Sequence, residues 1–211
     1  MFRDRKDAGQ QLGEALRPFK EQDPLILAIP RGGVEVALHA ALALEADLRI
    51  LVARKLPLPR NPEAGFGAIA EDGSTFVIEH VARMLNQEIV EAIVREQKEE
   101  IRRRIDVLRG GEPLPPLDGR TVILIDDGIA MGSTMRAGIA MCRRQKAGRV
   151  IAAAPVTGPS TAEEIGRIAD DLVILETPAN FRAVAQVYER WHDVSDDEVL
   201  QLMQEYRRAG E

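Results

Sequence analysis

Short, uninterrupted apolar runs recur along this chain, and helical patterns separate them. The runs are residues 25–30, 48–53, 121–125, 149–155 and 171–177. Strands that face solvent on one side alternate polar and apolar residues, whereas strands of a parallel sheet are buried on both faces and read as continuous apolar runs. The pattern therefore predicts an α/β fold: an open, mainly parallel twisted sheet with helices on both faces.

The segments between these runs predict helices and two insertions. Amphipathic spacing predicts helices over residues 4–19, 34–44, 135–145, 160–169 and 194–209, with Ser195 as the N-cap of the last. Residues 67–79 predict a small β-hairpin with Asp72-Gly73 as its turn, and residues 80–108 predict one long amphipathic helix. We expect one domain over residues 1–211, with a core at about 20–176 on which the N-terminal helix and C-terminal segment pack.

Composition excludes several classes of protein. The formal net charge of the 211 residues is −6, which gives no general basis for nucleic-acid binding. No apolar run approaches membrane-spanning length, and the N-terminus lacks the apolar core of a signal peptide. The one cysteine, Cys142, lies within a helical pattern, so we expect it to be a packing residue in a reducing compartment. We therefore expect a cytoplasmic protein.

Residues that can bind a ligand follow four of the apolar runs. In open α/β sheets, ligands bind at the carboxyl ends of the strands. The segments that follow the first four runs are Pro-Arg-Gly-Gly at 30–33, Arg-Lys at 54–55, Asp-Asp and a glycine-containing loop at 126–134, and Pro-Val-Thr-Gly at 155–158. We expect these segments to meet at one edge of the sheet.

Most of these residues suit a phosphorylated ligand, but two do not. Glycines and a helix N-terminus let backbone N–H groups reach an anion, and Arg31, Arg54 and Lys55 add positive charge. Asp126 and Asp127 would repel phosphate unless a cation compensates them. Mg²⁺ binds a few carboxylates together with phosphate oxygens and water. The predicted ligand is therefore polyphosphorylated, carries hydroxyl groups and binds with Mg²⁺.

The segment VILIDDGIAMGST at residues 122–134 resembles the phosphoribosyl-diphosphate (PRPP) binding motif of type I phosphoribosyltransferases. PRGGV, which starts at Pro30, resembles the pyrophosphate loop of this family, and ARK at 53–55 resembles the strand end before its mobile loop. Order and spacing agree over roughly residues 25–160. The whole chain resembles a bacterial subgroup of predicted phosphoribosyltransferases, with RKLPLPRNPEAGFGAIAEDG as its second signature.

The resemblance implies a role for each loop. Asp126 and Asp127 would hold the ribose 2′- and 3′-hydroxyls, directly or through Mg²⁺. Arg31 and the glycines after it would bind pyrophosphate, often through a cis peptide in this family. The segment that would wrap the 5′-phosphate comprises Gly128, Ile129, Ala130, Met131, Gly132, Ser133 and Thr134, and the pyrophosphate loop comprises Arg31, Gly32 and Gly33.

The resemblance also implies the reaction. Lys55 and its neighbour Arg54 would contact phosphate oxygens, and residues 56–66 would form a lid that excludes water. The catalytic residues would be Asp126, Asp127, Lys55 and Arg31. A nitrogen nucleophile would attack C1 of PRPP as pyrophosphate leaves. Family members often form dimers, so we expect a homodimer.

Two positions depart from the family pattern. Met131 stands where most members carry threonine, so one hydroxyl to the 5′-phosphate is missing. Ala130 stands where enzymes that act on 6-oxopurines place an acidic residue, which disfavours a hypoxanthine or guanine acceptor. The sequence leaves the acceptor open.

Other readings stay open at this stage. Phe181, or with less support Trp191, could stack on an acceptor base, although aromatic residues near a chain end more often pack. The three histidines, at positions 39, 80 and 192, lack metal-ligand spacing and are interpreted as structural or surface residues. The leading hypothesis is a phosphoribosyltransferase. The alternatives are a PRPP-sensing regulatory or accessory protein without transferase activity and, with less support, another phosphotransferase or hydrolase.

Overall fold

The apolar runs form a five-stranded, fully parallel sheet in the order β2-β1-β6-β7-β8. The computed structural model describes residues 1–209, with backbone only at 62 and 63, so the last two residues of the predicted domain lie outside the described residues. The strands are β1 (Leu25–Ala28), β2 (Asp47–Ile50), β6 (Thr121–Ile125), β7 (Arg149–Val156) and β8 (Asp171–Glu176). The prediction of an open parallel sheet is confirmed.

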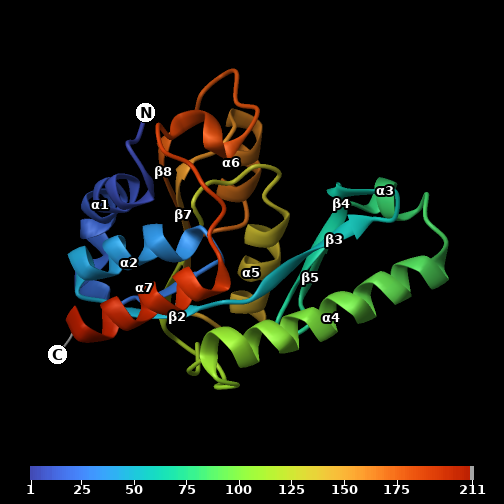
Figure 1. Cartoon of the computed structure of the whole chain (residues 1–211), viewed down its shortest axis with the longest axis horizontal. Helices are drawn as coiled ribbons and strands as arrows, with labels where there is room; N and C mark the ends of the chain where they lie inside the picture. Colours follow the sequence, from blue (N-terminus) through green and yellow to red (C-terminus); the bar gives the residue numbers. More distant parts are fainter. Residues whose placement is uncertain (210–211) are drawn as a thin grey trace.

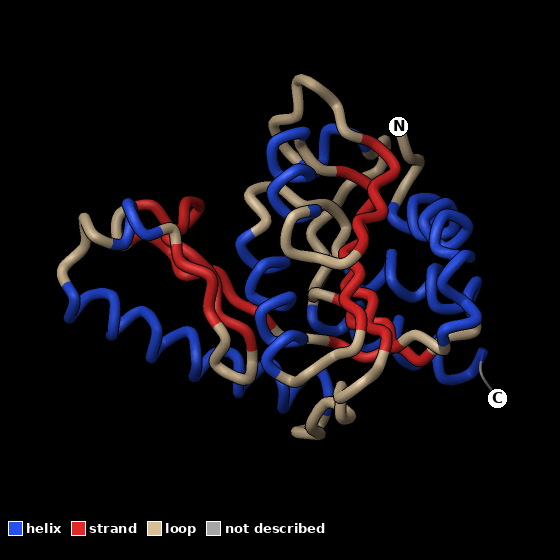
Figure 2. Tube along the Cα trace, turned by 180° about the vertical axis from the view of Figure 1, so that it is seen from behind, coloured by secondary structure: helices blue, strands red, loops and turns tan. Residues whose placement is uncertain are grey.

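Helices cover both faces of this sheet, as Figures 1 and 2 show. Alternate side chains of β6 enter opposite cores: Ile123 and Ile125 pack on one face, Val122 and Leu124 on the other. The first core takes in residues of α1 (Arg5–Leu16), α2 (Gly33–Leu44) and α7 (Asp196–Ala209), and the second takes in residues of α5 (Ser133–Arg144) and α6 (Pro159–Gly166). Burial on both sides explains why the strands carry no polar alternation.

The long helix predicted over 80–108 is confirmed from residue 87 onward, but its start is wrong, because a separate short helix precedes it. Residues 83–86 separate a short helix α3 (Glu79–Ala82) from α4 (Gln87–Arg109). The last of them, Asn86, is extended, and its side chain accepts a hydrogen bond from the Glu88 N–H at 2.8 Å. Asparagine is a strong N-cap residue, so it starts a new helix within a continuous apolar stripe. The helix predicted over 4–19 ends at Leu16, and a 3₁₀ helix, η1 (Arg17–Gln22), with Pro18 in its first turn, continues from it.

A second, antiparallel sheet with α4 against it forms an arm beside the main sheet (Figure 1). Its strands are β3 (Ala53–Leu58), β4 (Asn61–Ala70) and β5 (Thr75–Val77). The hairpin predicted around Asp72-Gly73 is confirmed as the β4–β5 connection. The prediction of one strand over the apolar run 48–53, however, is wrong: β2 ends at Ile50, and β3 begins a different sheet at Ala53.

The predicted lid, residues 56–66, lies within the β3–β4 ribbon. Prolines cannot donate a ladder hydrogen bond, so the three in this segment suggest an irregular loop. The ribbon accommodates Pro57 by shifting register on either side of it, so that Leu56 pairs with Gly67 and Pro57 with Gly65.

The C-terminal helix begins as predicted. The Ser195 hydroxyl accepts from the Glu198 N–H at 3.2 Å, and the Glu198 carboxylate accepts from the Ser195 N–H at 2.7 Å, a reciprocal capping box. The segment before it includes the 3₁₀ helix η2 (Val184–Val187). Cys142 is buried, which raises the pKa of its thiol to about 12 and agrees with a packing role. Among the described helices, none is long and apolar enough to cross a membrane.

A buried ion pair ties the arm to the edge of the main sheet. Arg109 Nη2 lies 2.8 Å from Glu71 Oε1, and both side chains are about nine-tenths buried. Arg109 also donates to the Ile50 carbonyl at 3.1 Å, and Glu71 accepts from the Val52 N–H at 2.9 Å. The pair therefore holds the β2–β3 junction against α4.

Arg109→Met should destabilise the protein strongly, because it leaves the buried Glu71 carboxylate without its counter-charge. We expect the free energy of unfolding, measured by urea denaturation, to fall by about 3 kcal/mol. The control is Arg17→Met, since Arg17 pairs with Glu14 in an exposed contact; there we expect a change of about 0.5 kcal/mol or less. Equal effects of the two variants would contradict a structural role for the buried pair.

Candidate active site

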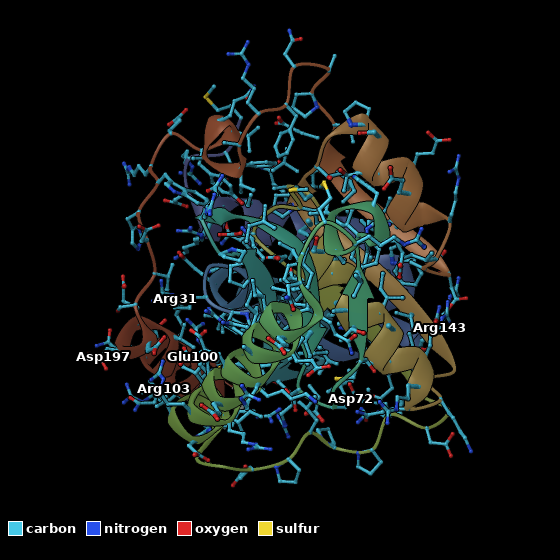
Figure 3. All side chains as sticks on the ribbon, turned by 90° about the vertical axis from the view of Figure 1, so that its right-hand side faces the viewer. Arg31, Asp72, Glu100, Arg103, Arg143 and Asp197 are labelled. Carbon is cyan, nitrogen blue, oxygen red and sulfur yellow. The ribbon has the colours of Figure 1, made fainter. Side chains whose placement is uncertain are left out.

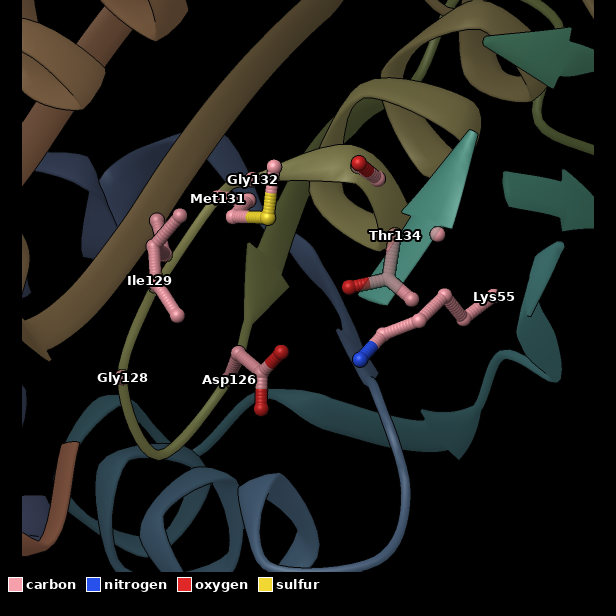
Figure 4. A pocket seen from close by; sticks show the side chains of 10 residues that line it. Lys55, Asp126, Gly128, Ile129, Met131, Gly132 and Thr134 are labelled. Carbon is pink, nitrogen blue, oxygen red and sulfur yellow. The ribbon is translucent and has the colours of Figure 1, made fainter. Parts of the chain in front are cut away.

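A cavity of about 140 Å³ lies beside the carboxyl end of β6. Its lining residues are Lys55, Gly65, Asp126, Gly128, Ile129, Ala130, Met131, Gly132, Ser133 and Thr134. Figure 4 shows that the side chains of Lys55, Asp126 and Thr134 point toward one another across it. The structure thus brings a lysine from one segment of the chain to the carboxylate and glycine-containing loop of another.

The loop between β6 and α5 is held from outside the cavity. The Ile129 N–H donates to the Val156 carbonyl at 2.8 Å, and the Thr157 hydroxyl donates to the Ile129 carbonyl at 2.7 Å. The Thr161 hydroxyl donates to the Ala130 carbonyl at 3.1 Å. The Ile129 N–H is therefore engaged elsewhere, and the first turn of α5 is the part of this loop best placed to receive an anion.

Gly132 shapes the start of α5. Its φ is +72°, in the left-handed region that favours glycine, and a Cβ here would lie 3.1 Å from Thr161 Cγ2. The turn directs the first residues of the helix into the cavity, where Ser133 and Thr134 line the wall. A helix N-terminus with two hydroxyl side chains suits a phosphate group.

The loop after β1 lies directly against the carboxylate pair. Its peptide bond between Pro30 and Arg31 is cis, as the family resemblance implied. A Cβ on Gly33 would lie 2.9 Å from the Cα of Asp126, and one on Gly32 would lie 1.8 Å from Asp127 Oδ2. Only residues without a side chain allow these two loops to approach so closely.

The two adjacent carboxylates have different surroundings. Asp126 lines the cavity, and its Oδ1 accepts from the Asp127 N–H at 2.8 Å. Asp127 Oδ2 instead accepts from Arg5 Nε at 2.8 Å. Burial raises the pKa of both carboxyl groups; the charge of Asp127 raises that of Asp126 further, and Arg5 opposes the rise at Asp127.

The three basic residues expected at the site do not all reach it: Lys55 lines the cavity, whereas Arg54 and Arg31 do not. Arg54 lies next to Lys55 in a strand and points the other way, where its Nε donates to Gln97 Oε1 at 3.1 Å and burial lowers its pKa. Both residues belong to β3, so their predicted place after the second strand of the main sheet is wrong. Arg31 is exposed, with Nη1 3.8 Å from Asp196 Oδ1.

Figure 3 shows Arg31 on the same side of the molecule as Glu100 and Arg103 of α4 and Asp197 of α7. Arg103 Nη2 also lies 3.8 Å from the Asp196 carboxylate. Arg31 therefore lies outside the residues that line the cavity and faces the start of α7.

Comparison with known proteins agrees with this geometry. The sequence pattern of the phosphoribosyl transferase domain matches residues 6–189. The chain belongs to this family. It is 39% identical over 210 residues to Mycobacterium tuberculosis proteins of two strains that are provisionally named phosphoribosyl transferases. The match covers 99% of this chain and 47% of those proteins, so the chain spans about half their length.

Solved structures show the same architecture. The crystal structure of TT1426 from Thermus thermophilus is 35% identical and has a TM-score of 0.82, with 97% of this chain and 98% of that chain covered. A hypoxanthine-guanine phosphoribosyltransferase from Bacillus anthracis is 11% identical with a TM-score of 0.50 and 88% coverage of each chain, which shows a shared fold alone. The second of these matches places the chain in the fold of a phosphoribosyltransferase.

Arg5 is the site residue of this family member that the sequence analysis missed. Its side chain is 3% exposed, although it lies near the N-terminus, far from the loop that it contacts. One signal was present: Arg5, Ala8 and Leu12 follow helical spacing, so an arginine shares the buried stripe of α1. Tyr188 was also missed, because it lies 61 positions from Asp127 in the sequence. Its hydroxyl donates to the Asp127 carbonyl at 2.7 Å.

The aromatic residues considered for base stacking lie outside the cavity lining. Phe181 packs on the backbone of Gly158, where a Cβ would be 3.3 Å from its ring, and against a small core around Phe2 and Val156. Trp191 lies on Arg5, whose guanidinium carbon is 3.9 Å from the ring centroid. Both residues make packing contacts in this structure, and a base-stacking role for Phe181 stays a prediction.

Proposed function

We propose that this protein transfers the 5-phosphoribosyl group of PRPP to a nitrogenous acceptor with the help of Mg²⁺ and releases pyrophosphate. One observation carries the proposal: a carboxylate, a lysine and the N-terminus of α5 converge on one cavity, with a glycine loop against the carboxylates. Membership of the phosphoribosyl transferase domain family supports the same reading.

Different residues of the cavity bind different parts of PRPP. The 5′-phosphate binds at the first turn of α5, with the hydroxyls of Ser133 and Thr134. The pyrophosphate group binds between the loop of Gly32 and Gly33 and the ammonium group of Lys55. When PRPP binds, the Arg31 side chain turns away from Asp196 and toward the pyrophosphate group. These positive charges and N–H groups stabilise the negative charge that develops on the leaving group.

The residues present fit Mg²⁺, although no cluster of three or more His, Cys, Asp or Glu among the described residues could hold a metal by itself. Mg²⁺ is commonly bound by one or two carboxylates together with substrate phosphates and water. Asp126 would hold it, since this carboxylate lines the cavity whereas Asp127 is bonded to Arg5. When bound, the metal would neutralise charge on the pyrophosphate group.

The β3–β4 ribbon supplies the cover of the site. Lys55 and Gly65, from its two strands, line the cavity. A ribbon that closes over the donor would exclude water, which would otherwise hydrolyse the activated sugar. The predicted lid thus keeps its role in this proposal, but as paired strands instead of an irregular loop.

The second candidate function is a PRPP-binding sensor without transferase activity. The Asp127–Arg5 ion pair favours it, because this pair takes one of the two carboxylates that the family resemblance assigns to the sugar. The lysine within the cavity favours the enzyme, since a sensor needs no group that stabilises the leaving pyrophosphate.

One experiment separates the candidates. The protein is incubated with PRPP, Mg²⁺ and a panel of nitrogenous bases and amines, and pyrophosphate release is measured beside PRPP binding. Release with any acceptor supports the transferase and names the acceptor class. Tight PRPP binding without release from any acceptor supports the sensor. Absence of PRPP binding contradicts both.

Met131→Thr should strengthen PRPP binding. Met131 is 60% exposed at the mouth of the cavity, so the substitution costs little packing and restores the hydroxyl that most family members carry. A hydrogen bond to a charged phosphate contributes about 2 kcal/mol, which corresponds to about thirtyfold in affinity by calorimetry. Met131→Val, which has the shape of threonine without its hydroxyl, is the control. Equal gains in both variants would contradict a contact between this position and the phosphate.

A further inference from the structure

A buried arginine that the proposed reaction does not use joins three distant parts of the chain. Arg5 of α1 donates from Nε to Asp127 Oδ2 at 2.8 Å and from Nη1 to the His192 carbonyl at 2.9 Å. Its guanidinium also stacks on Trp191, 3.9 Å from the ring centroid. The N-terminal helix, the loop after β6 and the C-terminal segment therefore meet at one side chain.

The contacts of Arg5 leave Asp127 little freedom. Its carboxylate is bonded to Arg5, its carbonyl accepts from the Tyr188 hydroxyl at 2.7 Å, and its N–H donates to Asp126 Oδ1 at 2.8 Å. The backbone of Gly32 closes the remaining side, since a Cβ there would lie 1.8 Å from Asp127 Oδ2. Asp126 is joined to this fixed residue both by the peptide bond and by a hydrogen bond.

The aromatic residues around Arg5 keep water from the pair. Tyr188 is buried, its ring lies 5.2 Å from Trp191 and 5.7 Å from Phe2, and burial raises the pKa of its hydroxyl. An ion pair is strongest where solvent is excluded and where the arginine has further hydrogen-bond partners, as the His192 carbonyl provides.

We propose that Arg5 is a positioning residue of the phosphoribosyl site: through Asp127 it fixes the orientation in which Asp126 meets the sugar and its metal. The inference rests on the proposed function, because it assumes that the ribose of PRPP binds at these carboxylates. Residues that orient a ligating carboxylate typically change metal or substrate affinity by one to two orders of magnitude when they are removed.

The chain offers matched variants for the test. Arg5→Met keeps most of the apolar stem and removes the hydrogen bonds. Arg5→Lys keeps the charge but cannot serve Asp127 and the His192 carbonyl in the same planar geometry. Arg3→Met is the control, since Arg3 lies two residues away with a 69% exposed side chain. Each variant is first examined by circular dichroism and thermal melting, and Trp191, the one tryptophan of the chain, reports the local contact by its fluorescence.

Calorimetry with three ligands then separates positioning from general damage. We expect Arg5→Met to weaken PRPP and ribose 5-phosphate binding in the presence of Mg²⁺ by about tenfold or more, and Arg5→Lys to recover part of the loss. Inorganic pyrophosphate, titrated without Mg²⁺ so that it needs only the glycine loop and Lys55, should lose clearly less affinity than ribose 5-phosphate does. Arg3→Met should match the wild type with all three ligands.

The possible failures are distinguishable. A folded Arg5→Met protein with altered Trp191 emission and wild-type affinity for PRPP would overturn the positioning role while leaving the proposed function intact. An equal loss for pyrophosphate and for ribose 5-phosphate would overturn it too, since damage would then extend beyond the carboxylates. If Arg5→Met does not fold, wild-type PRPP affinity in folded Arg5→Lys overturns the inference. Absence of PRPP binding by the wild-type protein would contradict the proposed function itself.

Discussion

Gly32→Ala should abolish PRPP binding while leaving the fold intact. The added Cβ would lie 1.8 Å from Asp127 Oδ2 and 2.8 Å from Arg5 Nε, so the carboxylate, the arginine or the loop must move. A displacement of about 1 Å at a binding site can cost about 100-fold, and we expect at least that loss in PRPP affinity by calorimetry. Burial of the sheet does not depend on this loop, so the far-ultraviolet circular dichroism should stay unchanged.

The matched control is Gly138→Ala within α5. Its Cβ would meet Leu124 Cδ1 at 3.4 Å, an ordinary van der Waals contact, and alanine favours a helix by about 1 kcal/mol over glycine. We expect wild-type PRPP affinity and equal or higher stability. If Gly32→Ala binds PRPP as well as Gly138→Ala does, the close approach of the two loops has no part in ligand binding.

Asp126→Asn should stabilise the free protein at neutral pH and remove Mg²⁺-dependent PRPP binding. Burial and the neighbouring charge of Asp127 raise the pKa of Asp126 well above its ordinary value of 3.8. A carboxyl group with a raised folded pKa costs stability as the pH rises above its unfolded pKa, because folding then opposes its ionisation. The amide avoids this cost and keeps an oxygen that can accept from the Asp127 N–H.

The pH dependence of the melting temperature tests whether the ionised Asp126 carboxylate lowers the stability of the free protein. The melting temperature of Asp126→Asn should exceed that of the wild type at pH 7, and the difference should shrink as the pH falls to about 3, below the unfolded pKa, where the wild-type carboxyl is protonated in both states. PRPP affinity in Mg²⁺ should fall by about 100-fold, since a charged ligand contact is lost. A variant that is less stable than the wild type at pH 7, or one that binds PRPP normally, would contradict the role assigned to Asp126.

The main sheet was predictable because its signals are local. Runs such as TVILI have the continuous apolar composition of a buried parallel strand, and the loops that follow residues 25–28 and 121–125 meet at the site. Asp126 and the loop to Thr134 could be placed together because they are neighbours in sequence. The cis peptide at Pro30 came from the family resemblance and not from any physical pattern in the residues.

The arm and the Arg5 contact were not predictable from local patterns. The break before α4 depends on one capping residue, Asn86, within an apolar stripe that continues on both sides. The β3–β4 ribbon depends on pairing between two strands, and the prolines in this segment argue against strands when the sequence is considered alone. Arg5 meets Asp127 across 122 positions, and only its place on a buried helix stripe indicated that it needed a partner inside.

The most direct test of the central claim is isothermal titration of the wild-type protein with PRPP, with and without Mg²⁺. The account predicts one binding site per chain, affinity that depends on Mg²⁺, and competition by ribose 5-phosphate and by pyrophosphate. Each competitor should occupy one half of the site, at the first turn of α5 or at the glycine loop beside Lys55. Absence of PRPP binding with Mg²⁺ present, or binding that neither competitor displaces, would contradict it.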